Sequence, residues 1–199
     1  MIDPLEITPC QKYGMCFPCD GRVFEAVCLE VLKTKPVVKF LEIGMWKGLT
    51  ARGLKKFVEE NGGTLDYWGI DPGLLEAPEE PFPGAHFFHA KSEYAFHLVP
   101  DDFDIVLMDG NHSRNGVILD TFNYHTKVVP GGFMLFHDTN PGCQGTGYEY
   151  SGPQIPQFGI AVREAWDLMG WPFVHWQFFM EGMPPGHHQN GTTAFRYVR

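Results

Sequence analysis

Apolar residues follow a helical spacing in several stretches of the chain. Between Arg22 and Lys33 they recur at every third or fourth position, so they share one face of a helix. The same spacing predicts a second helix from Thr50 to Val58, closed by two glycines, and a third over residues 115–128. Residues 1–20 show no clear periodicity and contain three prolines, so we expect an irregular arm there.

Short, largely apolar runs lie between these helices, as expected of strands buried on both faces of a sheet. They are Val37–Gly44, Leu65–Asp71, Ala85–His89, Phe103–Asp109 and, after a turn predicted at Pro130–Gly132, Phe133–Asp138. Strands that alternate with helices predict a parallel sheet with helices on both faces. Two last runs, 173–180 and 192–198, are too close for a crossover helix and predict an antiparallel hairpin at the sheet edge. The expected fold class is α/β: a Rossmann-like, doubly wound, mostly parallel seven-stranded sheet with an antiparallel C-terminal hairpin.

The charge balance narrows the choice of partner. The formal net charge is −9, which argues against a nucleic-acid backbone or an anionic membrane surface. No apolar run approaches the ~20 residues that cross a bilayer. The N-terminus lacks the basic and then apolar build of a signal peptide. We therefore expect a cytoplasmic protein whose partner is a small molecule, not nucleic acid or membrane.

Three of the five cysteines, Cys10, Cys16 and Cys19, lie close together near the N-terminus. A tetrahedral zinc site needs four ligands, and only the distant Cys143 or a histidine could complete it. Reduced thiols in a covering loop are therefore the favoured interpretation, and a zinc site is the alternative.

Polar residues and glycines follow five consecutive predicted strands. In a doubly wound sheet the ligand lies beyond the carboxyl ends of the strands, where the strand order reverses, so these residues are candidates for a site. A polar residue at the end of a strand can be purely structural, and this explains any single candidate. It explains less well why both inner strands end in an aspartate, Asp109 and Asp138. In strand order the candidates are Gly44 and Gly48, Asp71, Ser92 and Glu93, Asp109 and His112, and His137, Asp138 and Thr139.

The glycine spacing indicates which ligand the site accepts. A nicotinamide fingerprint has three glycines in the pattern G-x-G-x-x-G. Here Gly44 and Gly48 enclose the bulky Met45 and Trp46, which leave little room for a pyrophosphate. A ligand without phosphates fits better. Asp71, after the second strand, is an acceptor suited to both hydroxyls of a ribose.

On these motifs the segment Val37–Asn140, about half of the chain, resembles the class I methyltransferases that use S-adenosylmethionine (SAM). It is more narrowly similar to the small-molecule O-methyltransferases that bind a divalent metal, including those acting on sugars of macrolide antibiotics. The resemblance implies that Asp71 binds the ribose of SAM, and that Ser92 and Glu93 lie beside the adenine. The cofactor-binding residues that it implies are Glu42, Gly44, Gly48, Asp71, Ser92, Glu93 and Asp109.

The same resemblance implies a metal and a base. Asp109 and Asp138 match metal ligands, and His112 matches the general base; Thr139 stands where metal-binding relatives usually have another Asp or Asn, and is the third expected ligand. A histidine can take the proton of an alcohol near neutral pH. Mg²⁺ on hard oxygen ligands lowers the pKa of a bound hydroxyl. His112 has a second interpretation, as the cap of a helix that starts near Asn115.

We therefore expect one SAM-dependent methyltransferase domain over residues 1–199. Its parts are an N-terminal arm and helix (1–36), a SAM-binding core (37–140) and a substrate-side loop, helix and closing hairpin (141–199). The expected reaction is methyl transfer to a hydroxyl of a small molecule. The alternatives are a non-catalytic SAM- or sugar-binding module, a hydroxylase, and the less favoured nicotinamide oxidoreductase. The arm either closes over SAM or docks on a second copy of the chain, so a homo-oligomer is an open expectation.

Overall fold

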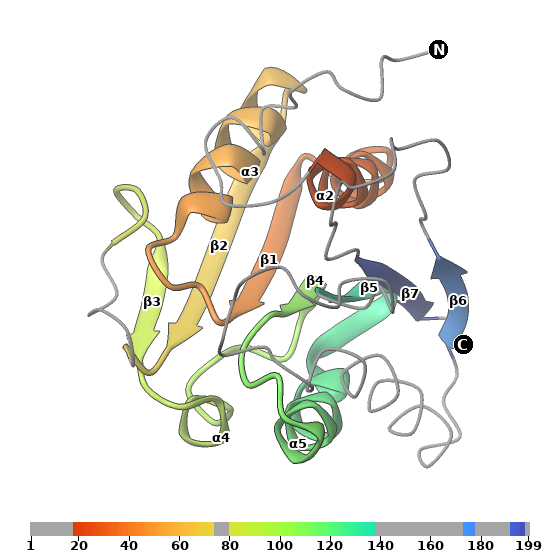
Figure 1. Ribbon diagram of the computed structural model, residues 1–199. Helices are drawn as coiled ribbons and strands as arrows, with labels where there is room; N and C mark the ends of the chain where they lie inside the picture. The colour runs from red at the N-terminus through yellow and green to blue at the C-terminus, as the bar shows by residue number, and fades with distance from the viewer. Residues whose placement is uncertain (1–17, 74–79, 138–172, 178–191, 198–199) are drawn as a thin grey trace, which may run out of the picture.

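The computed structural model describes residues 18–73, 80–137, 173–177 and 192–197 (Figure 1). None of the described helices is both long enough and apolar enough to cross a membrane. In chain order the elements are α2 (Pro18–Leu32), β1 (Val37–Ile43), α3 (Leu49–Glu60), β2 (Thr64–Asp71), β3 (His86–His89), α4 (Ser92–Ala95), β4 (Phe103–Met108), α5 (Arg114–Tyr124), a 3₁₀ turn (His125–Lys127), β5 (Val128–Phe136), β6 (Phe173–Gln177) and β7 (Thr193–Tyr197).

Seven strands form one sheet in the order β3-β2-β1-β4-β5-β7-β6. The first five strands in this order are parallel to one another, whereas β7 runs antiparallel to both β5 and β6. The chain builds outward from β1 to β3 and then continues on the other side of β1 with β4 and β5 (Figure 1). The predicted fold class is confirmed. Because the strand order reverses between β1 and β4, a ligand is expected beyond their carboxyl ends.

The N-terminal helix begins earlier than the sequence predicts. We expected an irregular arm over residues 1–20, but α2 starts at Pro18. Proline suits the first position of a helix, because the N–H that it lacks has no partner in the first turn. The predicted arm therefore ended too late by three residues, and the rest of it, residues 1–17, lies outside the described residues.

The turn predicted at Pro130–Gly132 lies inside β5 instead. Phe103 of β4 pairs with Val128, and Ile105 pairs with Phe133, so β5 advances five residues while β4 advances two. The surplus residues form a bulge, which absorbs the proline and the glycines without ending the strand. The proline and the glycines do interrupt the regular pairing, but the interruption is a bulge within β5 and not a turn before it.

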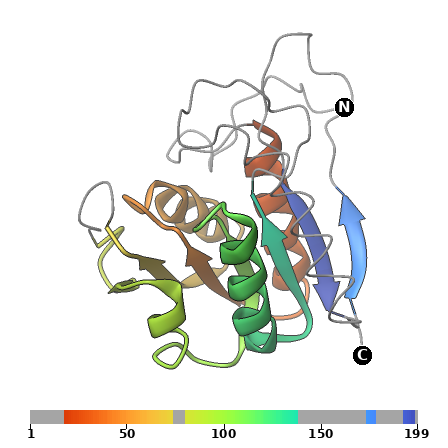
Figure 2. The same cartoon turned by 60° about the horizontal axis from the view of Figure 1, so that its bottom comes forward.

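Helices cover both faces of the sheet. α2 and α3 pack on one side, and α4 and α5 on the other (Figure 2). Successive side chains of the strands point to opposite faces, as the pleat requires. In β1, Val38 and Phe40 pack with α2 and α3, whereas Leu41 and Ile43 pack with α5. Both faces of the central strands are therefore buried, which explains their continuous apolar runs.

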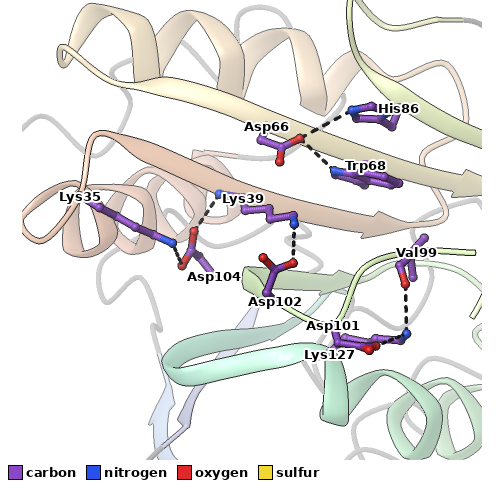
Figure 3. Close-up of polar contacts among 10 residues, drawn as sticks. All are labelled: Lys35, Lys39, Asp66, Trp68, His86, Val99, Asp101, Asp102, Asp104 and Lys127. Carbon is purple, nitrogen blue, oxygen red and sulfur yellow. Dashed lines mark hydrogen bonds and ion pairs between the residues drawn. The ribbon is translucent and has the colours of Figure 1, made fainter.

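A buried carboxylate joins the amino ends of β1 and β4 (Figure 3). Asp104, at the start of β4, is 3% exposed. Its Oδ2 accepts a hydrogen bond from the backbone N–H of Lys39 at 2.8 Å, and the Nζ of Lys35 lies 2.7 Å from its Oδ1. Asp102 also pairs with Lys39, through a side chain that is 66% exposed. Asp104 therefore holds the two central strands together at the edge opposite to their carboxyl ends.

Replacing Asp104 with alanine should lower the free energy of unfolding by about 2 kcal/mol, because the N–H of Lys39 loses its acceptor inside the protein. Asp102→Ala, which removes an exposed partner of the same lysine, is the matched control and should cost less than about 1 kcal/mol. Urea unfolding of the full chain, followed by circular dichroism, measures both. Equal losses in the two variants would contradict the role given to Asp104.

Candidate active site

The turn after β1 brings the carboxyl ends of β1 and β4 into contact. Gly44 has a φ of 91°, and a Cβ on it would lie 2.1 Å from the carbonyl oxygen of Asp109. Its N–H donates to the carbonyl of Ile70 at 2.8 Å. Only glycine allows both this conformation and this approach. Gly48, at the start of α3, packs as closely, since a Cβ there would lie 2.4 Å from the Cβ of Pro81.

Asp71, at the end of β2, holds the loop that follows β1. Its Oδ2 accepts a hydrogen bond from the backbone N–H of Trp46 at 2.8 Å, and its Oδ1 accepts one from that of Gly73 at 2.6 Å. Trp46 has a φ of 43°, which is uncommon for a bulky residue. Its indole Nε1 is buried and has no hydrogen-bond partner in the part of the chain that the structure describes. Each oxygen of Asp71 keeps a second lone pair, so a ligand can still bind to it.

Two imidazoles flank the carboxylate of Asp109 after β4. The Nε2 of His112 lies 3.3 Å from Oδ1 of Asp109, and the Nδ1 of His137 lies 3.1 Å from the same oxygen. The other ring nitrogen of His137 lies 3.3 Å from Oδ2 of Asp20, on α2. The hydroxyl of Thr192 donates to Oδ1 of Asp20 at 2.6 Å. A continuous chain of polar side chains thus runs from α2 and the start of β7 to the loop after β4.

This polar chain is buried at one end and open at the other. Asp20 is fully buried and His137 is 8% exposed, whereas the side chains of Asp109 and His112 are 28% and 25% exposed. Burial raises the pKa of Asp109, but His137 and His112 outweigh it and hold that pKa well below its usual range. Asp109 is therefore an anion at neutral pH. With the Nε2–H of His112 directed at Asp109, the neutral ring carries its lone pair on Nδ1.

The interpretation of His112 as a helix cap is wrong. The cap of α5 is Ser113, whose Oγ accepts a hydrogen bond from the N–H of Gly116 at 3.1 Å. Asn111 accepts one from the N–H of Ser113 at 3.0 Å. A Cβ on Gly116 would lie 2.4 Å from Cγ of Asn111, so the loop packs tightly against the first turn of the helix. His112 is thus held between two fixed neighbours, with its ring directed at Asp109.

Glu42 lies within β1, and only 2% of it is exposed. The hydroxyl of Tyr67, on β2, donates to its Oε2. Burial raises the pKa of Glu42 to about 8; the hydrogen bond from Tyr67 opposes this rise, and the charge of Asp109 adds to it. Glu42 is therefore mostly protonated at neutral pH, and its carboxyl group can donate as well as accept. Its contact with a cofactor remains a prediction.

Two residues expected beside an adenine begin α4. The hydroxyl of Ser92 donates to Oδ1 of Asp120, on α5, at 2.5 Å. The side chain of Glu93 is exposed. The N–H of Ala90 donates to the carbonyl of Asp71 at 3.0 Å, so α4 follows directly on the joined ends of β2 and β3. Both residues therefore lie at the same edge of the sheet as Gly44 and Asp109, but on the β3 side.

Asp109 offers an oxygen donor for a cation. The two imidazoles lie against its Oδ1, and its side chain is 28% exposed. A carboxylate oxygen at a partly exposed strand end suits Mg²⁺, which prefers hard oxygen ligands. Asp138 and Thr139 lie outside the described residues, and within those residues no group of three His, Cys, Asp or Glu side chains could hold a metal. The donor in place fits a divalent cation, while the set of ligands remains a prediction.

Two buried carboxylates near the site, Asp20 and Asp120, were not predicted from the sequence, and His137 was a strand-end candidate with no assigned role. His137 directly precedes Asp138, so the strand-end argument that selected Asp138 applied to it equally. Asp20 fell in the expected irregular arm, and its partner His137 is 117 residues away. One feature of the sequence could have indicated Asp120: it is a carboxylate on the buried side of α5, where an apolar residue is expected.

The doubly wound sheet, its glycine turn and its acidic strand ends define the class of protein: a Rossmann-like α/β domain with a polar site at the switch point of the strand order. The family described as "Methyltransferase domain" matches residues 41–139, about half of the chain. The chain belongs to the class I, SAM-dependent methyltransferases. No curated protein sequence matches it significantly.

Solved structures of methyltransferases share the fold. The O-methyltransferase NovP matches with a TM-score of 0.63 over 94% of this chain and 83% of its own, at 13% identity. The Podospora anserina methyltransferase PaMTH1, bound to S-adenosylhomocysteine (SAH), has a TM-score of 0.55 over 96% of this chain and 92% of its own, at 14% identity. MycE of the mycinamycin biosynthetic pathway, in complex with Mg, SAH and mycinamycin VI, gives 0.57 over 91% of this chain but 49% of its own, at 18% identity. At these identities the likeness shows the fold.

The stability of the wild type should fall as the pH rises from about 5 to about 8, and Glu42→Gln should remove most of this slope. The pKa of Glu42 is about 8 in the folded chain and about 4.5 when unperturbed, so folding takes up a proton between these values. The stability present below the lower value is lost as the pH rises through the higher one, by roughly 2–4 kcal/mol. Urea unfolding of both proteins across this pH range measures the effect. The same slope in the variant would show that another group is responsible.

Proposed function

We propose that this chain transfers a methyl group from SAM to a hydroxyl of a small molecule, with a histidine base and the assistance of Mg²⁺. The observation that carries the proposal is the Asp109–His112 pair: an imidazole directed at an ionised carboxylate, next to the Gly44 turn. The SAH in PaMTH1 and MycE, and the Mg and mycinamycin VI in MycE, support these ligand classes.

The acidic side chains at the strand ends suit a cationic cofactor. The charges of Asp109 and Asp71 both contribute to the raised pKa of Glu42, so the three carboxyl groups lie near one another. SAM, when bound, supplies an activated methyl group on a positively charged sulfur. Under this proposal Asp71 accepts hydrogen bonds from the ribose hydroxyls, while Glu42 and the turns at Gly44 and Gly48 line the methionine part.

The acceptor hydroxyl needs activation, because a neutral alcohol is a poor nucleophile. His112, with its Nε2–H directed at Asp109, accepts the hydroxyl proton on Nδ1. SAM, held by Asp71, Glu42 and the Gly44 turn, would supply its methyl group to this oxygen, and the electron pair of the broken carbon–sulfur bond would remain on the sulfur. The ionised Asp109 stabilises the imidazolium that forms, and His137 holds Asp109 in place from the other side.

Asp109, Asp138 and Thr139 would hold the divalent cation. When bound there, a cation polarises the acceptor oxygen and lowers its pKa, which complements the histidine base. The partly exposed carboxylate of Asp109 supports this assignment, because it places a hard oxygen ligand at the end of β4.

A non-catalytic SAM- or sugar-binding module and a hydroxylase are the competing functions. The oriented imidazole favours an enzyme over a binding module, since binding alone does not require a base. A hydroxylase would consume molecular oxygen, so product formation under anaerobic conditions separates it from a methyltransferase.

The full chain should bind SAH with micromolar affinity, and Asp71→Asn should weaken this binding on the order of 10- to 100-fold, because the ribose hydroxyls lose an ionised acceptor. Asp66→Asn is the matched control, as Asp66 lies on the same strand away from its carboxyl end, and it should bind SAH as the wild type does. Isothermal titration calorimetry measures all three. Undetectable binding by the wild type would remove the basis of the proposed function.

His112→Asn should lower the rate of methyl transfer by roughly 10²- to 10⁴-fold and leave the Kd for SAH nearly unchanged, because the base acts on the acceptor and not on the cofactor. His125→Asn, at the other end of α5, is the control and should keep full activity. The measurement is SAH released from SAM with a panel of phenols, catechols and sugars, with and without EDTA. Full activity in His112→Asn would rule it out as the base, and full activity in EDTA would rule out the cation.

A further inference from the structure

The side chain of Asp120 is buried between α5 and α4 and takes no part in the proposed reaction. Asp120 is 5% exposed, and its Oδ1 accepts the hydrogen of the Ser92 hydroxyl at 2.5 Å. The hydroxyl of Tyr124, one turn further along α5, donates to the backbone carbonyl of Ser92 at 2.7 Å. Two residues of α5 therefore hold the side chain and the main chain of the first residue of α4.

This cluster lies at the carboxyl edge of the sheet. On one side, the chain just before Ser92 is tied to β2 by the hydrogen bond from Ala90 to the carbonyl of Asp71. On the other side, Oδ2 of Asp120 lies 3.6 Å from the position that a Cβ on Gly110 would take, in the loop after β4. Ser92 therefore lies beside the end of β2, whose Asp71 is the proposed ribose ligand, on the side away from the Gly44 turn that would line the methionine part of SAM. The adenine of SAM would lie on this side.

The pairing determines which hydrogen-bonding group Ser92 presents. Burial raises the pKa of Asp120 to about 6, with the hydrogen bond from Ser92 opposing and the charge of Glu93 adding, so at neutral pH the carboxyl group is mostly ionised. An ionised carboxylate only accepts hydrogen bonds, so the hydrogen of Ser92 is directed at it. The Ser92 oxygen is then left with lone pairs and acts as an acceptor. An acceptor is complementary to an amino group and repels a keto oxygen.

We propose that Asp120 is a positioning residue that fixes Ser92 as the hydrogen-bond acceptor for the exocyclic amino group of adenine. The site thereby selects an aminopurine cofactor over the corresponding ketopurine. This inference rests on the proposed function, because it takes SAM as the cofactor. It adds a residue on α5 that acts only through another side chain.

The test compares the Kd of SAH with that of S-inosylhomocysteine, which has a keto oxygen in place of the amino group. The full-length wild type should prefer SAH on the order of 10- to 100-fold. Asp120→Ala and Ser92→Ala should each reduce this preference by about 10-fold, and the double variant should reduce it no further, because both changes remove the same oriented acceptor. Tyr124→Phe is the matched control: it removes the other hydrogen bond to Ser92 and should keep the preference.

The outcomes separate the inference from the function on which it rests. If Asp120 only supports the fold, Asp120→Ala weakens both ligands equally, and the unchanged ratio of the two Kd values overturns the inference. Equal affinities of the wild type for both ligands overturn it as well. A wild type that binds neither ligand contradicts the proposed function and the inference together. Thermal unfolding of each variant, with Ser92→Ala as the milder change, confirms that the proteins compared are folded.

Discussion

The candidate site depends on the contact between Gly44 and the carbonyl oxygen of Asp109. No side chain fits between them, and the backbone at Gly44 has a positive φ, so two of the central strands can end side by side only with glycine there. This contact lies where the strand order reverses, between β1 and β4, and the loops after these two strands run in opposite directions along the sheet. The contact fixes the position of the Asp109 backbone relative to the loop after β1. The positions of His112 and of the loop at Trp46 follow from it.

The second constraint is electrostatic. Glu42, Asp71 and Asp109 gather at one sheet edge in a chain whose net charge is already −9. Each is accommodated differently: Glu42 takes up a proton, Asp71 accepts two backbone N–H groups, and Asp109 lies between two imidazoles. Through His137 the polar contacts extend to Asp20 and Thr192, so the N-terminal helix and the start of β7 are linked to the central site. A cationic ligand would relieve the remaining repulsion.

The fold could be predicted from local patterns because its central strands are buried on both faces and its helices on one. The prediction failed where a residue's usual role differs from its role here. Pro18, expected in an irregular arm, begins a helix, and Pro130 with its glycines, expected in a turn, forms a bulge within β5. The site could be predicted as far as strand ends determine it, which includes Asp109 and His112. Asp20 could not be found this way, because its partners are 117 and 172 residues distant and only the sheet topology brings them together.

Helix α5 connects the two halves of the site. The proposed base, His112, precedes its cap, and Asp120 lies in the second turn of the helix. The same helix holds α4 through Ser92, so the adenine end and the reacting end of a bound cofactor would be located by one rigid element. Methyl transfer needs little beyond an in-line approach at close distance, so its rate is set mainly by positioning. Under the proposed function, one helix that begins just after the base and holds the adenine-side contact would provide that positioning without a large rearrangement.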